Sequence, residues 1–275
     1  MDRIINDRCL PFSNNLFRII YLFNSMITVV FPYLHSYAVW DELRFTLRSL
    51  CANLNYPFQV MIFGDIHPGL QDVNFVEMEN ISGGDFSKAK DAIKKMRAIV
   101  ENPSVSDDFL YWYDDIVLLS KIDRSFFDKL YALNDLDKFE RREHDNYKIN
   151  LWRTYDVLKY NHLKTINYET HLPHLFNKKK MKFILDNFCP NGEPLLINSL
   201  YHNYFRSDFV YFLRKNDKIK AGFYGLNSDT SFDNTTNYEV VLPEKIFCNY
   251  NNKGLNTGLK KYIIGQFPKF CKYEK

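Results

Sequence analysis

The chain has 275 residues, a formal net charge of +3, 46% hydrophobic residues and 17% aromatic residues. This apolar content is enough for a large folded core and argues against intrinsic disorder, while the small net charge argues against a nucleic-acid-binding protein. The five cysteines are odd in number and none has CxxC spacing, so we expect neither a zinc site nor a disulfide framework, and we expect a reducing cytoplasm.

The N-terminal region contains an apolar stretch, residues 16–34, that Arg18 and Pro32 interrupt. The stretch is too broken for a membrane span and lacks the small-residue cleavage site of a signal peptide. We therefore expect no stable transmembrane segment, and peripheral association with the inner face of the membrane stays open. Met26 directly precedes a strand-like stretch, which motivates the hypothesis that translation starts there and that residues 1–25 are an N-terminal extension.

The first half of the chain alternates between apolar, β-branched runs and amphipathic stretches. The runs predict strands at 27–31, 59–63, 73–78 and 109–113, and the amphipathic stretches predict helices at 39–53, 87–100 and 125–133. This alternation predicts an α/β fold with a mostly parallel central sheet and flanking helices. The second half is less regular, and it predicts helices at 177–187, 195–205 and 258–267 and loops at 140–145 and 216–237.

Two adjacent carboxylates, Asp114 and Asp115, end the aromatic-rich strand predicted at 109–113. Burial of an unpaired charge is costly, so carboxylates at the end of such a strand need a reason to be there. Asp65 follows another predicted strand, and ligands of parallel sheets bind at the carboxyl ends of the strands. We expect Asp114 and Asp115 to hold Mg²⁺ or Mn²⁺ against a diphosphate. The alternative is a turn with two solvated acids.

Arginine and histidine side chains supply further candidates. Arg44 and Arg48, on the first predicted helix, are able to pair bidentately with phosphate, and Arg206 is a similar candidate. The alternative for the helix is a solvated face with ion pairs four residues apart. His171 and His174 flank Pro173, and a single histidine can act as a general base towards a hydroxyl at neutral pH. The alternative for both is a structural hydrogen bond.

Four blocks resemble segments of the Stealth family of sugar-phosphate transferases, which includes bacterial capsule enzymes and the animal lysosomal N-acetylglucosamine-1-phosphotransferase. Residues 41–50 (DELRFTLRSL) resemble its ELRYSLRS segment, and residues 108–115 (DFLYWYDD) resemble its FIYFNDD segment. Residues 171–178 (HLPHLFNK) resemble its HMPHMIDR segment. Residues 247–251 (FCNYN) and 267–274 (FPKFCKYE) resemble its closing CLND and FPxxSxFE segments. The blocks follow the family's order over nearly the whole chain.

The resemblance implies a glycosyltransferase-A-like fold, a nucleotide-sugar donor, a divalent metal and a role in surface polysaccharide. Catalytic roles are then expected for His171, as the base towards an acceptor hydroxyl, and for Asp115 and Arg206. Contacts with the nucleotide sugar are expected for Arg44, Arg48, Asp65, Asp114, His174 and Asn251. Two departures stand out: the family's opening TWVDG segment is replaced by Val30-Phe31-Pro32-Tyr33-Leu34, and Asn251 stands where the family has Asp.

The sequence therefore predicts a metal-assisted transferase that moves a sugar phosphate, or a sugar, from a UDP-sugar to a glycan acceptor in surface or capsular polysaccharide synthesis. Attack at the anomeric carbon would release a nucleoside diphosphate, and attack at phosphorus would release a nucleoside monophosphate. We expect one domain over residues 26–275, with a nucleotide-binding half at 26–135 and an acceptor-binding half at 136–275. The alternative is a non-catalytic carbohydrate-binding protein on a decayed transferase fold, which the abundance of aromatic residues also suits.

Overall fold

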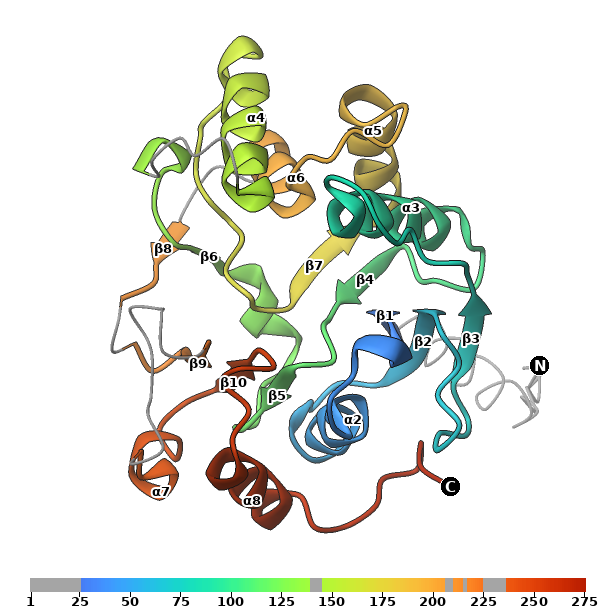
Figure 1. Cartoon of the computed structure of the whole chain (residues 1–275), viewed down its shortest axis with the longest axis vertical. Helices are drawn as coiled ribbons and strands as arrows, with labels where there is room; N and C mark the ends of the chain where they lie inside the picture. The colour runs from blue at the N-terminus through green and yellow to red at the C-terminus, as the bar shows by residue number, and fades with distance from the viewer. Residues whose placement is uncertain (1–25, 139–144, 206–209, 215–216, 225–235) are drawn as a thin grey trace, which may run out of the picture.

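A computed structural model describes residues 26–138, 145–205, 210–214, 217–224 and 236–275 of the chain (Figure 1). Three of the sequence-based predictions lie wholly or mostly outside these residues: the N-terminal extension, the loop at 140–145 and the role of Arg206. The four cysteines within the described residues are free thiols.

The main sheet has five strands in the order β3-β2-β1-β4-β7. Four of them are mutually parallel: β1 (Ile27–Tyr33), β2 (Phe58–Gly64), β3 (Asn74–Glu77) and β4 (Asp108–Tyr111). The edge strand β7 (His174–Asn177) runs antiparallel to β4. Because helices cover both faces, the central strands are mostly apolar, as is usual for parallel sheets. The prediction of an α/β fold with a mostly parallel central sheet is confirmed.

Helices cover the two faces of this sheet through two separate apolar clusters. One cluster packs α3 (Ser87–Glu101), α4 (Asn146–Tyr160), α5 (Lys178–Phe188) and α6 (Ile197–Phe205) against one face, and these helices gather on one side of the sheet in Figure 1. The other cluster packs α2 (Glu42–Asn53) against the opposite face. Val30 belongs to the first cluster and Val29 to the second, since successive strand residues point to opposite faces.

Two smaller sheets complete the structure. The first has the order β5-β10-β9 and consists of β5 (Ile116–Leu118), β10 (Phe247–Tyr250) and β9 (Lys220–Phe223). The second pairs β6 (Leu130–Ala132) with β8 (Val210–Phe212). The remaining elements are the helices α7 (Tyr238–Val241) and α8 (Thr257–Gln266) and the 3₁₀ turns His35–Tyr37, Arg124–Asp128 and Leu136–Lys138. All three sheets combine strands from before and after residue 135, so the two halves of the chain interleave.

The predicted local structure needs correction at four places. The helix predicted at 125–133 is wrong, because a 3₁₀ turn there is followed by β6, which pairs with a strand about 80 residues later in the chain. The helix predicted from residue 39 begins at Glu42, whose carboxylate accepts hydrogen bonds from the N–H groups of Val39 and Trp40. The sequence reasoning missed α4, which Asp145 caps, and β9, which lies within the predicted loop at 216–237.

Candidate functional site

A cavity of about 340 Å³ lies at the carboxyl ends of β1 and β4. The chain runs from β1 to β2 and β3 on one side and then returns to place β4 on the other side of β1. Such a reversal of strand order opens a crevice at which open α/β sheets bind ligands. The cavity therefore occupies the position that the topology alone assigns to a ligand.

The turn between β4 and β5 brings Asp114 and Asp115 to the wall of this cavity. The backbone of the turn is fixed from two sides: the Thr46 hydroxyl of α2 donates to the Asp114 carbonyl at 2.6 Å, and the Tyr250 N–H of β10 donates to the Asp115 carbonyl at 3.4 Å. The Trp112 indole N–H closes the turn through the Ile116 carbonyl at 2.9 Å. These contacts fix the position of the turn, and backbone N–H groups of the turn also bind the two carboxylates.

The environment of the two carboxylates disfavours their charged forms. Burial and the neighbouring Glu42 raise the pKa of Asp114 to about 6. Burial and the adjacent Asp114 raise the pKa of Asp115 to about 8. Glu42 also lines the cavity, and burial raises its pKa despite the backbone N–H groups that bind it. Besides Asp91, which is paired with Lys95, three carboxyl groups thus face one cavity, and a cation placed there would relieve their mutual repulsion.

Two lysines line the cavity, and neither forms an ion pair with Asp114 or Asp115. Lys95 is 2% exposed and forms an ion pair with Asp91 at 2.8 Å, and the exposed Lys88 has its Nζ 5.9 Å from the centroid of the Tyr37 ring. Among the described residues, neither Asp114 nor Asp115 forms an ion pair within 4.0 Å, and no three His, Cys, Asp or Glu side chains converge on a metal position. Two adjacent carboxylates fit Mg²⁺ or Mn²⁺ when phosphate oxygens and water supply the other ligands.

His171 lies beside this cavity without lining it. Its ring centroid is 6.5 Å from that of Tyr113, which does line the cavity, and 5.6 Å from that of Tyr224. The backbone of His171 has φ of 50°, an uncommon value for a residue with a Cβ. Surrounding protein, which partly desolvates the ring, and the Lys220 cation lower the pKa of His171, although the residue stays exposed to solvent. The ring is therefore neutral at pH 7 and able to accept a proton.

His174 lies elsewhere, on β7 and 6% exposed. Its Nδ1 is 3.1 Å from Nε2 of His202, and its ring stacks on Phe176 with centroids 5.7 Å apart. Burial lowers the pKa of His174 to about 3. His174 does not line the cavity, so the geometry gives it a place in the core of the protein and none in the candidate site.

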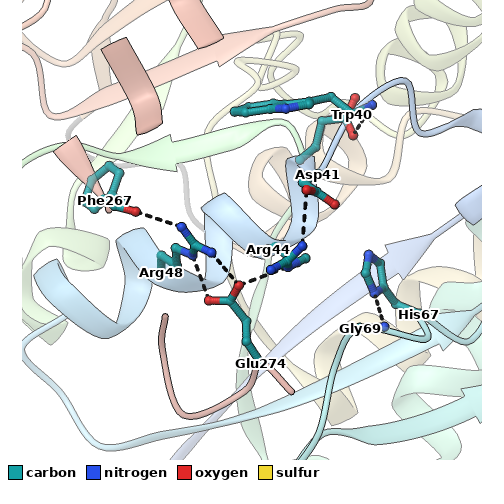
Figure 2. Close-up of polar contacts among 9 residues, drawn as sticks. Trp40, Asp41, Arg44, Arg48, His67, Gly69, Phe267 and Glu274 are labelled. Atoms are coloured by element: carbon teal, nitrogen blue, oxygen red, sulfur yellow. Dashed lines mark hydrogen bonds and ion pairs between the residues drawn. The ribbon is translucent and has the colours of Figure 1, made fainter. Parts of the chain in front are cut away.

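Arg44 and Arg48 are bound within the protein, as Figure 2 shows. Arg48 Nε and Nη2 donate to the Glu274 carboxylate at 2.7 and 2.8 Å, and its Nη1 donates to the Phe267 carbonyl at 3.0 Å. Arg44 Nε donates to the same carboxylate at 2.9 Å. Neither arginine lines the cavity, so the structure does not bring them together with Asp114 and Asp115.

Asp65 and Asn251 also make local structural contacts. Asp65 follows β2 as predicted, and its carboxylate accepts from the His35 N–H at 2.8 Å and from the Asn80 amide at 2.9 Å. Asn251 follows β10, and its side-chain oxygen accepts from the N–H groups of the turn that it begins. Neither lines the cavity, whereas the neighbouring Asn252 does.

Sequence reasoning missed several cavity residues, of which Glu42, Lys88, Asp91 and Lys95 carry charge. A signal for the last two was present. Asp91 and Lys95 are four residues apart on a predicted helix, and Lys95 lies between the buried Ile93 and Met96. A charged pair at this spacing within an apolar stripe indicates a buried ion pair.

Comparison with known proteins gives similarities of shape alone. No family model and no curated protein matches the chain. The galactosyltransferase LgtC in complex with donor and acceptor sugar analogs is 12% identical, with 90% of this chain and 98% of that chain covered and a TM-score of 0.47. The bifunctional glycosyltransferase WbbM is 12% identical, with 90% and 50% covered and a TM-score of 0.47. The glycosyltransferase GlyE of Streptococcus pneumoniae TIGR4 is 13% identical, with 70% and 46% covered and a TM-score of 0.35.

These values are too low to transfer a substrate or a residue role to this chain. Separately, none of the helices within the described residues has the length and apolar character that crossing a bilayer requires.

Proposed function

We propose that the protein is a nucleotide-sugar-dependent transferase with a glycosyltransferase-A-like fold, and that the donor occupies the cavity beside Asp114 and Asp115. The observation that supports this proposal is the position of the two carboxylates. They line a cavity at the strand-order reversal, and no described cation lies within ion-pair distance of them. A nucleoside diphosphate is an anion, so it would enter this acidic cavity together with a divalent cation.

Asp114 and Asp115 are the residues that would hold Mg²⁺ or Mn²⁺. When bound, the cation would stabilise negative charge on the departing nucleotide. The aromatic rings of Tyr111 and Tyr113 line the same cavity and offer apolar walls to the donor. His171, neutral at pH 7 and beside Tyr113, is placed to take the proton from an acceptor hydroxyl.

Two reactions suit this arrangement: transfer of a sugar, with release of UDP, and transfer of a sugar phosphate, with release of UMP. The resemblance of the four sequence blocks to sugar-phosphate transferases favours the second reaction and a glycan acceptor in surface or capsular polysaccharide synthesis. The roles expected for Arg44 and Arg48 are not part of the proposal, because Glu274 binds both side chains.

The test is the nucleotide product formed from a panel of UDP-sugars with Mg²⁺ or Mn²⁺ and a panel of glycan acceptors. UDP or UMP release by the wild type, abolished in Asp115→Asn, supports the proposal and identifies the broken bond. Asp137→Asn, which changes an exposed carboxylate outside the cavity, is the matched control. If neither nucleotide forms, and Asp115→Asn leaves metal-dependent UDP binding unchanged, the proposal is wrong. Metal-dependent UDP binding without turnover on any acceptor would favour the alternative of a non-catalytic carbohydrate-binding protein.

A further inference from the structure

A polar cluster adjoins the cavity and consists of five residues: Thr170, His171, Lys220, Tyr224 and Asn249. None of the five lines the cavity. The His171 ring connects the two regions, because it is close both to the ring of Tyr113, which lines the cavity, and to the ring of Tyr224. The polar cluster therefore lies on the side of the site where the proposed base meets the acceptor.

Lys220 is the cation of the polar cluster. Its Nζ donates to the Thr170 carbonyl at 2.5 Å and to the Tyr224 hydroxyl at 3.4 Å. Lys220 forms no ion pair with a carboxylate of the described residues, although exposed lysines such as Lys218 do. An ammonium has three N–H donors, so one donor of Lys220 has no partner in the described part of the chain. Burial lowers the pKa of Lys220 to about 8, as expected for an ammonium without a neighbouring counter-charge.

The Tyr224 hydroxyl adds a second available donor. The Tyr224 hydroxyl accepts hydrogen bonds from Lys220 and from the Asn249 side-chain amide, which leaves its own O–H to donate. Asn249 is 1% exposed, and its Oδ1 has no partner among the described residues; the same holds for Oγ1 of the buried Thr170. The Thr170 hydroxyl is able to donate to a ligand as well as to accept, whereas Asn249 Oδ1 only accepts and does not contribute to binding an anion.

We propose that Lys220 and Tyr224 form an anion-binding subsite for a carboxylate or phosphate group of the acceptor. This inference rests on the proposed function and makes the acceptor an acidic glycan. The Lys220 ammonium and the Tyr224 O–H both donate, which matches the acceptor-only oxygens of such a group. The acceptor is favoured over the donor phosphate as the source of the anion, because the polar cluster lies beside His171 and outside the cavity.

The test is titration of the protein with inorganic phosphate, before and after saturation with UDP and Mg²⁺, followed by NMR chemical shifts. We expect phosphate to bind the UDP-saturated wild type at a site separate from UDP. In Lys220→Met the phosphate affinity should fall about tenfold or more, and in Lys220→Arg it should recover, because a charge-assisted hydrogen bond is lost and then restored. Lys218→Met is the matched control, since this exposed lysine is two residues away and lies 3.7 Å from Glu244.

Tyr224→Phe, which removes only the hydroxyl, should weaken phosphate binding with UDP binding unchanged. Unaltered phosphate binding in both folded Lys220→Met and Tyr224→Phe would overturn the subsite. Phosphate that competes with UDP, together with weaker UDP binding in Lys220→Met, would assign the anion to the donor and overturn the acceptor assignment. The proposed function is tested separately by Asp115→Asn. Loss of UDP binding in that variant, with normal phosphate binding in Lys220→Met, would keep the function and reject the subsite.

Discussion

Arg48 and Glu274 lie 226 residues apart in the chain and bind each other through two hydrogen bonds of 2.7 and 2.8 Å. Both side chains are buried, at 7% and 0% exposure. The pair joins α2 to the C-terminal segment (Figure 2). The Phe270 ring covers the Arg48 guanidinium at 4.6 Å. Two of the sequence blocks that resemble the sugar-phosphate transferases, residues 41–50 and 267–274, are thus partners in one contact whose evident role is structural.

Replacement of Arg48 by lysine should destabilise the protein, although the positive charge is kept. A lysine cannot reproduce the two parallel bonds to Glu274 and the third bond to the Phe267 carbonyl. We expect a loss of about 3 kcal/mol in the free energy of unfolding, measured by urea denaturation. Arg124→Lys is the control, because its ion pair with Asp128 is largely exposed and should contribute less than about 1 kcal/mol. Equal losses in the two variants would contradict a structural role for Arg48.

The same pair predicts a dependence of stability on pH. Burial alone would raise the pKa of Glu274, but the hydrogen bonds from Arg48 and from the Cys271 N–H outweigh it and hold the pKa below 4.5. A carboxyl group with a lowered pKa in the folded state stabilises the protein above its unfolded value and loses this contribution as pH falls through the folded value. The free energy of unfolding should therefore decline below pH 4.5 more steeply in the wild type than in Glu274→Gln. Parallel pH profiles of the two proteins would show that Glu274 does not contribute.

The raised pKa of Asp115 predicts that ionisation of this carboxyl group destabilises the folded protein, which is the reverse of the effect of Glu274. The carboxyl group ionises near 3.8 in the unfolded chain and near 8 in the folded protein. Between these values the unfolded state gains stability relative to the folded state as pH rises. In metal-free buffer above pH 8, Asp115→Asn should be more stable than the wild type by on the order of 1 kcal/mol or more, and the difference should vanish near pH 4.

The effect of Mn²⁺ on thermal stability gives a second test of Asp115. The wild type should gain thermal stability with Mn²⁺, because a ligand that binds only the folded state stabilises it, and Asp115→Asn should gain little. Stabilisation of both proteins by the same amount would place the cation elsewhere.

A side chain at Gly64, the last residue of β2, should destabilise the protein strongly. The φ of Gly64 is 131°, and a Cβ there would lie 2.0 Å from the Tyr33 carbonyl oxygen. Gly64→Ala should therefore cost about 2 kcal/mol or more in the free energy of unfolding. Gly265→Ala in α8 is the contrasting change, because no atom lies within 4 Å of its Cβ position and alanine favours helix by about 1 kcal/mol. A stabilising Gly64→Ala would contradict the described backbone.

The sequence predicted the parts of the fold that local patterns determine. The central strands β1 and β2 read as continuous apolar runs, and the amphipathic α3 and α5 are close to their predicted bounds. The short strands β6 and β8 escaped prediction, because their three-residue pairing depends on a partner far along the chain. The candidate site shows the same contrast between features set by local sequence and features that depend on distant residues. Asp114 and Asp115 follow β4 as predicted, although the strand ends at Tyr111 and not at Tyr113, whereas the partner of Arg48 lies 226 residues away in the chain.

The turn that carries Asp114 and Asp115 joins two sheets, because β4 belongs to one and β5 to the other. Strand β5 is held by β10, whose residues are synthesised long after those of β5. The pairing of β5 with β10 closes a long loop of chain between them, and closing a long loop is entropically costly and slow. A nascent chain halted before residue 247 should already pair β1 with β2 and β4, yet lack the strand that fixes the far end of this turn. Assembly of the candidate site should thus be a late event in folding, and pulse-labelling hydrogen exchange should show β10 protected after β1.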